Sequence, residues 1–367
     1  MNILVLPLLK RKVTSSALSS RPKVIFELSR ELIKKGHDVT ILGSADTHID
    51  GTQHLSVVDT DWSSMPAYEN VFYAQTAGLT LLANKLKEIG DRYDVIHNHT
   101  YPEFINLLVA DQIKTPIVTT IHTQPFDLLD ETFHQFDSSY LISISKAHRK
   151  LFTKTNIHKI VYNGIDTDLY AFKEAKDDYL LWLGRLSKAK NDDGSYQDPK
   201  GIKWAIKLAQ ETGMRLKLSG NIEDMKFFKQ DVEPHLNDRI QWIGPVSSEL
   251  SLKKEQVVEL MQNASVFLMT INWYEPFGLV MAESMSCGTP VIGFDRGSVS
   301  EIIVDGKTGF IVNPDEGIEG LKSAVEKLST INPSDCRTHV EQNFSLPVMA
   351  QNYENVYKEV IEQHKNR

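Results

Sequence analysis

The sequence predicts an α/β fold made of two similar-sized halves, each built on a parallel sheet. Across its 367 residues, short apolar runs alternate with segments of helical periodicity, which is typical of parallel strands covered by helices. A second set of strands and helices begins at Tyr179, after the turn at Asn163–Asp166, and we place the boundary between the halves near residues 165–175. The last helical segment has no strand after it.

The first half begins with the buried apolar run Ile3–Leu6, which is too short for a signal peptide and lacks a positively charged start. A helix follows, because apolar residues recur at helical spacing from 23 to 35 and Gly36 then ends the pattern. A second long helix is predicted over 71–89. The further strands predicted here cover 39–42, 94–97, 116–121, 140–144 and 160–162.

The second half repeats the alternation without a convincing residue-level repeat of the first. Predicted strands cover 179–183, 216–219, 240–243, 264–269 and 291–294, and predicted helices cover 202–208, 225–233, 255–263 and the segment after Gly278. Residues 188–200 are polar and predict a mobile loop, and 348–365 form the last helix.

Composition excludes several classes of function. Hydrophobic residues make up 41% and charged residues 24%, an ordinary globular mixture. The net charge of −8 argues against nucleic acid as a partner. No apolar stretch reaches the roughly 18 residues of a membrane span. Cys287 and Cys336 show no metal-ligand spacing, and so few cysteines fit a reducing compartment, so we expect a cytoplasmic protein.

The segment from 270 to 294 has the most specific pattern. Glu275 and Glu283 lie eight positions apart, around a Pro/Gly turn and the start of a predicted helix. Free N–H groups at a helix start attract phosphate, and Gly278 lets the backbone approach a ligand closely. A carboxylate beside a diphosphate is repelled, so each glutamate should contact sugar hydroxyls, as in a nucleotide sugar. Taken singly, each glutamate also fits an ordinary helix charge.

This glutamate pair resembles the paired-glutamate motif of the retaining family 4 glycosyltransferases. The resemblance covers most of the chain and is most specific in its second half. Further matching segments are Gly36–Thr40, His97–His99, Thr119–His122, Ile144-Ser145, Asn163–Asp166, Leu183–Leu186 and Gly306–Phe310.

The resemblance implies the GT-B fold, in which two Rossmann-like domains have parallel sheets that face each other across a cleft. Residues 1–168 would form the acceptor-side domain, and residues 169–345 the nucleotide-sugar-binding domain. Residues 346–367 would form a helix that crosses back to the first domain, which explains a last helix without a strand.

The resemblance also implies the roles of the site residues. Glu275 would orient the donor sugar, Glu283 would hold the ribose diol, and Arg185 with Lys200 would stabilise the leaving diphosphate. Lys188 and Lys190 are alternatives to Lys200, because a long insertion separates Lys200 from Arg185. Backbone contacts to the donor would come from Phe277, Gly278 and Leu279, weaker contacts from Gly297 and Ser298, and the segment 244–246 would lie near the base.

A structural alternative exists for Ser298 and Glu301, whose spacing is that of a helix capping box.

His122 follows a predicted buried strand, and a histidine at the matching place in the family lies near the donor sugar. His97 and His99 end another strand and are weaker acceptor-side candidates.

The first loop departs from the family pattern. Residues 10–23 contain no glycine but several basic side chains, which fit an anionic acceptor or a membrane surface as well as a solvated loop. The acceptor hydroxyl, on a glycan or a lipid-linked molecule, is not identified by the sequence.

The resulting expectation is a retaining, metal-independent glycosyltransferase that needs no cofactor beyond its nucleotide-sugar donor. UDP-glucose is the first choice and GDP-mannose the second, both from family frequency. The acidic pairs Asp59/Asp61 and Asp166/Asp168 are weak metal candidates. Alternatives are a GT-B epimerase or phosphorylase, and a non-catalytic nucleotide-sugar-binding or scaffold protein.

Overall fold

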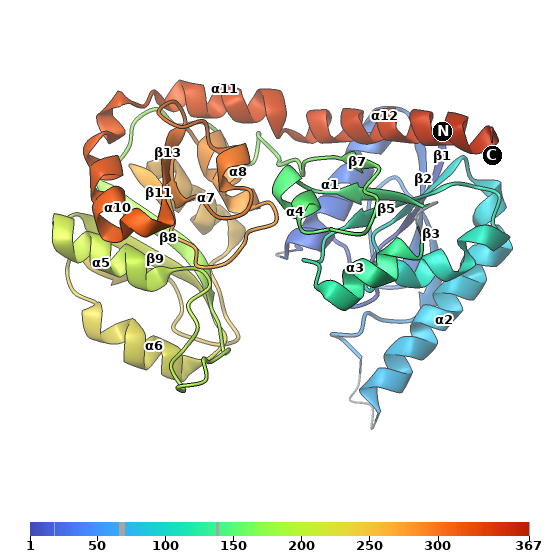
Figure 1. Cartoon of the computed structure of the whole chain (residues 1–367), viewed down its shortest axis with the longest axis horizontal. Coiled ribbons are helices and arrows are strands. Elements are labelled where there is room, and N and C mark those ends of the chain that lie inside the picture. Colours follow the sequence, from blue (N-terminus) through green and yellow to red (C-terminus); the bar gives the residue numbers. More distant parts are fainter. Residues whose placement is uncertain (18, 66–69, 137–138, 367) are drawn as a thin grey trace. The chain divides into compact units, whose positions relative to one another are not determined.

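The computed structural model describes residues 1–17, 19–65, 70–136 and 139–366. The chain divides into two compact units. Unit 1 comprises Met1–Ile165 and Leu346–Arg367, and unit 2 comprises Asp166–Ser345. Each unit has a parallel sheet with helices packed on it, so the predicted α/β fold class is confirmed (Figure 1).

Unit 1 contains a seven-stranded sheet in the order β3-β2-β1-β4-β5-β6-β7, with every described strand pair parallel. The order reverses between β1 and β4, and such a switch point is where ligands bind in open α/β sheets. The strands are β1 (Asn2–Leu6), β2 (Asp38–Ser44), β3 (Gln53–Val58), β4 (Val95–Asn98), β5 (Ile117–Ile121), β6 (Tyr140–Ser143) and β7 (Lys159–Ile160).

Helices cover the sheet of unit 1 because each has an apolar face. Leu79, Leu82 and Leu86 of α2 are buried in the same apolar cluster as Leu4 of β1. The helices are α1 (Ser20–Lys34), α2 (Val71–Ile89), α3 (Asp127–His134), α4 (Lys146–Lys150) and α12 (Leu346–Lys365), with short 3-10 segments η1 (Gly90–Arg92) and η2 (Glu103–Gln112).

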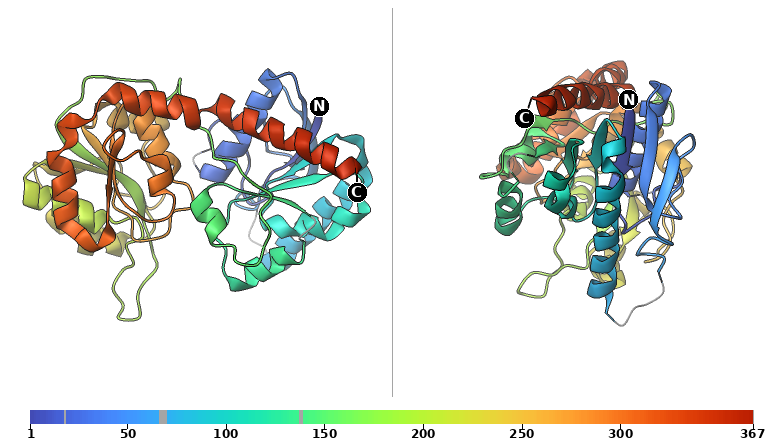
Figure 2. Two further views of the ribbon diagram at one scale, coloured as in Figure 1. Left: turned by 45° about the horizontal axis from the view of Figure 1, so that its top comes forward. Right: turned by 90° about the vertical axis from the view of Figure 1, so that its right-hand side faces the viewer.

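The last helix, α12, is part of unit 1 although 180 residues of unit 2 precede it in the chain. It contacts α1, and Figures 1 and 2 show it running along this unit to the C-terminus. Met349, Tyr353, Tyr357 and Val360 recur on one face and are buried, which is the spacing of a helix packed along one side. Lys35 after α1 pairs with Glu354 of α12 at 3.0 Å.

Unit 2 contains a six-stranded parallel sheet in the order β10-β9-β8-β11-β12-β13. Its order reverses between β8 and β11. The strands are β8 (Tyr179–Leu186), β9 (Arg215–Ile222), β10 (Ile240–Trp242), β11 (Val266–Met269), β12 (Val291–Phe294) and β13 (Gly309–Val312).

Figure 1 shows α5 and α10 on one face of the unit 2 sheet and α7 and α8 on the other. Trp182, Phe227, Phe228 and Phe294 are among the buried residues of its apolar core. The helices are α5 (Ile202–Thr212), α6 (Met225–Asp231), α7 (Lys254–Asn263), α8 (Leu279–Ser286), α9 (Val299–Ile302), α10 (Gly317–Glu326) and α11 (Pro333–Asn343), with 3-10 segments η3 (Glu233–His235), η4 (Pro314–Glu316) and η5 (Leu328–Thr330).

Among the described residues, no helix combines the length and the apolar character that crossing a membrane requires.

Candidate active site

Three side chains meet beside the switch point of unit 2. Lys200 precedes α5 and Glu275 follows β11, and Lys200 Nζ lies 2.8 Å from Glu275 Oε2. Trp273 Nε1 donates a hydrogen bond to the same carboxylate oxygen at 3.1 Å. The Lys200 ammonium also lies 4.4 Å from the centre of the Trp273 ring. Glu275 is only 8% exposed, so this pairing holds a largely buried carboxylate in one place.

The backbone brings Lys200 to this position through a very close contact. Gly201 begins α5 with φ +70°, and a Cβ there would lie 1.6 Å from the carbonyl oxygen of Thr270. Thr270 Oγ1 donates to the Gly201 carbonyl at 2.7 Å, and Trp182 Nε1 donates to the Lys200 carbonyl at 2.9 Å. Only glycine fits this position, so the start of α5 lies directly against the segment that leads to Glu275.

A second loop holds the backbone of Glu275. Ser298 N donates to the Glu275 carbonyl at 2.9 Å, and Glu275 forms an isolated parallel bridge with Gly297. Gly297 has φ +69°, and a Cβ there would lie 2.2 Å from the Glu275 carbonyl oxygen. The loop after β12 therefore fixes the main chain of the residue whose side chain Lys200 holds.

The capping box expected for Ser298 and Glu301 is wrong. Ser298 does precede α9, but its side chain makes no capping hydrogen bond. Its hydroxyl instead donates to the Phe277 carbonyl at 2.7 Å, and Ser298 is fully buried. Ser298 thus supports the Glu275–Gly278 turn, and its side chain is not exposed to a ligand.

The turn at Gly278 opens α8 as the sequence predicts. Gly278 has φ +78° and Leu279 is the first helical residue, so the first N–H groups of α8 follow the turn directly. Phe277 is 2% exposed, so its ring is not available for ligand contact. Glu283 lies on α8 beside Tyr170, where burial and the neighbouring carboxylate raise the pKa of the Tyr170 hydroxyl far above its ordinary value.

Arg185 pairs with a different carboxylate from the one that Lys200 contacts. It is inside β8 rather than after it, and its side chain is 54% exposed. Its guanidinium contacts Glu223, just beyond the neighbouring strand β9, at 3.2 Å. This partner was not predictable, because residues 38 positions apart meet only when the two strands pair.

The structure separates the three candidate lysines. Lys200 pairs with Glu275, whereas Lys190 Nζ lies 4.7 Å from the centre of the Tyr196 ring. Lys188 is exposed. Tyr196 itself is buried and stacked on Phe227, so the segment 188–200 is anchored to the core at this point.

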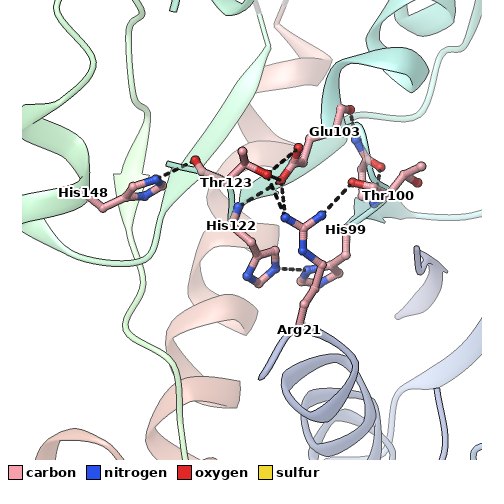
Figure 3. Close-up of polar contacts among 8 residues, drawn as sticks. Arg21, His99, Thr100, Glu103, His122, Thr123 and His148 are labelled. Atoms are coloured by element: carbon pink, nitrogen blue, oxygen red, sulfur yellow. Dashed lines mark hydrogen bonds and ion pairs between the residues drawn. The ribbon is translucent and has the colours of Figure 1, made fainter. Parts of the chain in front are cut away.

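A histidine cluster lies at the carboxyl ends of β4 and β5 in unit 1. His99 Nδ1 lies 2.9 Å from Nε2 of His122, and His99 Nε2 lies 3.3 Å from Nδ1 of His97 (Figure 3). His97 and His99 are 0% exposed, so neither ring contacts an acceptor and their expected acceptor-side role is wrong. His122 is partly exposed.

An ion pair that the sequence did not reveal supports His122. Arg21 of α1 donates to Glu103 Oε1 at 2.7 Å and to Thr123 Oγ1 at 3.0 Å. The same Glu103 oxygen accepts the backbone N–H of His122 at 3.2 Å, and His148 Nε2 lies 3.0 Å from the Thr123 carbonyl oxygen (Figure 3). Glu103 is buried, so this pair fixes the chain on both sides of His122.

The basic first loop lines a pocket of about 250 Å³ in unit 1. Lys10 and Arg21 both lie over the Tyr101 ring, at 5.1 and 5.3 Å from its centre. Arg21 is neutralised by Glu103, which leaves Lys10 and Arg11 as the uncompensated positive charges among the described lining residues. Residue 18 of this loop lies outside the described residues.

One aspartate of each acidic pair stabilises a turn. Asp61 is buried and accepts from Ser63 N at 2.8 Å and from Ser64 Oγ at 2.7 Å. Asp166 accepts from the backbone N–H groups of Asp168 and Leu169 at 3.0 and 3.1 Å. In the described ranges, no group of three or more His, Cys, Asp or Glu side chains is arranged to hold a metal ion. Both cysteines are buried.

Comparisons with known proteins identify the family of the chain. Residues 170–344 match the family model described as glycosyl transferases group 1, and residues 22–169 match the one described as glycosyltransferase family 4. The chain is 27% identical over 324 residues to an N-acetyl-alpha-D-glucosaminyl L-malate synthase from Bacillus anthracis, covering 78% of this chain and 80% of that protein.

Solved structures share the fold over nearly the whole chain. A sucrose-phosphate synthase from Thermosynechococcus elongatus has a TM-score of 0.77 at 16% identity, covering 99% of both chains. The Anabaena protein HepE in complex with UDP has a TM-score of 0.73 at 18% identity, covering 98% of this chain and 100% of that one.

Proposed function

Because the chain belongs to the family 4 glycosyltransferases and has their GT-B fold, we propose that it transfers a hexose from a nucleoside-diphosphate sugar to an acceptor hydroxyl, retaining the anomeric configuration. The observation that carries the proposal is the contact between Lys200 and the largely buried Glu275 at the switch point of unit 2. In such a donor, the ammonium of Lys200 can bind the diphosphate, and the carboxylate of Glu275 can accept hydrogen bonds from the sugar hydroxyls.

In this mechanism the cation and the carboxylate act on different parts of the donor. Lys200 and the N–H groups at the start of α8 face the diphosphate, where negative charge grows as the sugar–phosphate bond breaks. Glu275 accepts hydrogen bonds from sugar hydroxyls, and Glu283 holds the ribose diol. Arg185 breaks its ion pair with Glu223 to reach the diphosphate. That ion pair is weak, because the Arg185 side chain is exposed to solvent.

The acceptor oxygen forms a bond to the anomeric carbon on the face from which the diphosphate leaves. A donor phosphate oxygen takes the acceptor proton, so the diphosphate leaves protonated and the step requires neither a protein nucleophile nor a metal ion. We assign His122 a contact with a hydroxyl of the donor sugar. Two cations and a helix start supply the charge that a metal would otherwise provide.

For the donor we propose UDP-glucose, with GDP-mannose as the second candidate. The solved neighbours support the uridine nucleotide, since HepE has structures with UDP and with UDP-glucose. For the acceptor we propose an anionic molecule that Lys10 and Arg11 bind in the pocket of the first loop. The Bacillus anthracis relative, named for a product containing L-malate, supports an anion in this role.

The test is a transfer assay with UDP-glucose and a panel of acidic and neutral hydroxyl acceptors, with the anomeric configuration of the product read by NMR. We expect an α-linked product from the α-linked donor, and unchanged activity after EDTA. A β-linked product would exclude retention, and activity lost to EDTA would exclude metal independence. Donor binding without turnover on any acceptor would favour the binding-protein alternative.

A further inference from the structure

Two tyrosines of α12 enter the buried interior of unit 1 beneath the histidine cluster. Tyr353 and Tyr357 are 0% exposed, one helical turn apart on the same face. Tyr357 OH lies 2.6 Å from Nδ1 of His97, and Tyr353 OH lies 2.9 Å from Thr120 Oγ1. The last helix therefore contacts residues more than 230 positions earlier in the chain.

A continuous hydrogen-bonded chain runs from Tyr357 to His122. It passes through His97 Nδ1, then His99 Nε2 at 3.3 Å, and then from His99 Nδ1 to His122 Nε2 at 2.9 Å. His97 Nε2 is occupied separately, by Thr120 Oγ1 at 2.8 Å. The other nitrogen of His122, Nδ1, has no hydrogen-bond partner among the described residues, and Figure 3 shows it turned away from His99.

All three rings are neutral at physiological pH. Burial lowers the pKa of His97 to about 3, and burial lowers the pKa values of His99 and His122 well below their ordinary value, with the charge of Arg21 adding to the effect. A neutral imidazole carries one proton, so each ring donates through one nitrogen and accepts through the other.

The direction of the chain follows from Tyr357. In the described part of the structure, His97 is the only hydrogen-bond partner of the Tyr357 hydroxyl, which is buried. If His97 donated to it, the phenol hydrogen would be left without an acceptor, which is costly in a protein interior. Tyr357 therefore donates to His97 Nδ1, and the proton of His97 is on Nε2, where Thr120 accepts it.

The remaining protons are then determined in order. His97 Nδ1 has a single lone pair, which Tyr357 occupies at 2.6 Å, so His99 Nε2 at 3.3 Å can only share it as a second, weaker donor. We take His99 to be protonated at Nε2, because an unprotonated Nε2 would turn its own lone pair toward that of His97 Nδ1. His99 Nδ1 is then unprotonated, and at 2.9 Å His122 must donate to it from Nε2. The open nitrogen of His122, Nδ1, is left as a hydrogen-bond acceptor.

We propose that Tyr357 is a positioning residue, whose hydroxyl acts through His97 and His99 to keep Nδ1 of His122 unprotonated. This nitrogen then accepts a hydrogen bond from a donor-sugar hydroxyl, a role that rests on the proposed function of His122. An unprotonated nitrogen can bind only a group that donates a hydrogen bond. A sugar with fluorine in place of the contacted hydroxyl therefore loses the interaction, although fluorine is similar in size.

The direct test is a two-bond ¹H–¹⁵N correlation spectrum of the histidine rings in the uniformly ¹⁵N-labelled full chain, with His122 assigned from the signal lost in His122→Gln. We expect wild-type His122 to be protonated at Nε2 only. In Tyr357→Phe we expect His122 Nδ1 to gain a proton in a measurable fraction of molecules. The matched control is Tyr353→Phe, which removes an equally buried hydroxyl from the same helix face but leaves Tyr357 in place, so the His122 tautomer should not change.

Wild-type His122 protonated at Nδ1 would overturn the inference, and so would a Tyr357→Phe spectrum with the His122 tautomer unchanged. Once His122 is assigned, the wild-type spectrum decides the matter even if Tyr357→Phe or Tyr353→Phe fails to fold. The spectrum is recorded without substrate. If the protein has the predicted tautomers but shows no transfer activity, the proposed function is refuted and the inference about the tautomers stands. In an active enzyme, we expect Tyr357→Phe to lower kcat/KM by about 10-fold, the scale of one hydrogen bond, and Tyr353→Phe to leave it unchanged.

Discussion

At the residue scale, the proposed mechanism requires Lys200, rather than Lys188 or Lys190, to bind the diphosphate. Lys200 contacts Glu275 at 2.8 Å, while Lys190 lies over Tyr196 in the same polar segment. We expect Lys200→Ala to reduce transfer at least about 100-fold, because one charge contact to the transition state is lost. Steady-state kinetics with saturating donor measure this.

Lys190→Ala is the matched control for Lys200, since it removes a lysine of the same segment that has no contact with Glu275 in the described residues. It should retain nearly full activity. If Lys190→Ala were the inactive variant and Lys200→Ala the active one, the assignment of the diphosphate lysine would be reversed.

A glycine pair tests how the loop after β12 holds Glu275. Gly297 and Gly306 have nearly the same φ, +69° and +70°, but a Cβ at Gly297 meets the Glu275 carbonyl, and a Cβ at Gly306 meets nothing within 4 Å. Gly306→Ala should cost only the left-handed backbone strain, about 1–2 kcal/mol. Gly297→Ala should cost about 1–3 kcal/mol more because of overpacking, and should lower transfer.

Urea unfolding of the two alanine variants measures the difference. Equal destabilisation by both substitutions would show that the loop after β12 yields at this contact and does not fix the Glu275 backbone.

Residue contacts of this kind were only partly predictable. The spacing of Glu275, Gly278 and Glu283 indicates a turn followed by a helix, because both the glycine and the helix period are local signals. The partners of Arg185, Arg21 and His122 were not predictable. They come from other strands or helices, and single-sequence periodicity carries no information on pairs so far apart.

At the element scale, β4 contains His97 and is followed by His99, and both rings are buried in neutral form, which has a consequence for stability. The pKa of His97 is lowered to about 3, and that of His99 well below its ordinary value, both by burial. The unfolded chain binds protons to these two rings below about pH 6.5, whereas the folded protein does not. Folding stability is therefore fully present above pH 6.5 and declines as the pH falls below it.

We expect the free energy of unfolding to fall by up to about 2.7 kcal/mol per pH unit from these two histidines at the steepest part of the decline. Urea denaturation between pH 7 and pH 4.5 measures the slope. His97→Gln should flatten it by about half. A slope that stays the same in this variant would mean that other groups cause the acid destabilisation.

The elements themselves show where sequence patterns succeed. The helix predicted over 71–89 has those bounds, and the buried central strands were recovered because each is a continuous apolar run. The edge strand β3 was missed because it is exposed and lacks such a run. Helix α11 was missed because its sequence is polar and it buries only Cys336 and Val340.

At the scale of the whole molecule, the chain forms two units with the same Rossmann-like strand order, and α12 returns to the first. Lys200 and Glu275 lie beside the switch point of unit 2, and His122 follows the carboxyl end of β5, one strand from the switch point of unit 1. The family and the fold were recognisable from motifs, but the base and the acceptor were not, because they depend on side-chain contacts that no local pattern encodes.

The measurement that tests the central claim most directly is a thermal-shift titration of the wild-type chain and Lys200→Ala with UDP, UDP-glucose, GDP and GDP-mannose. A ligand at about 100 times its Kd adds roughly 2.7 kcal/mol of stability, which such a titration detects readily. We expect the uridine nucleotides to stabilise the wild type and Lys200→Ala to lose most of this effect. A folded wild-type protein that none of the four ligands stabilises would contradict the donor site at Lys200 and Glu275.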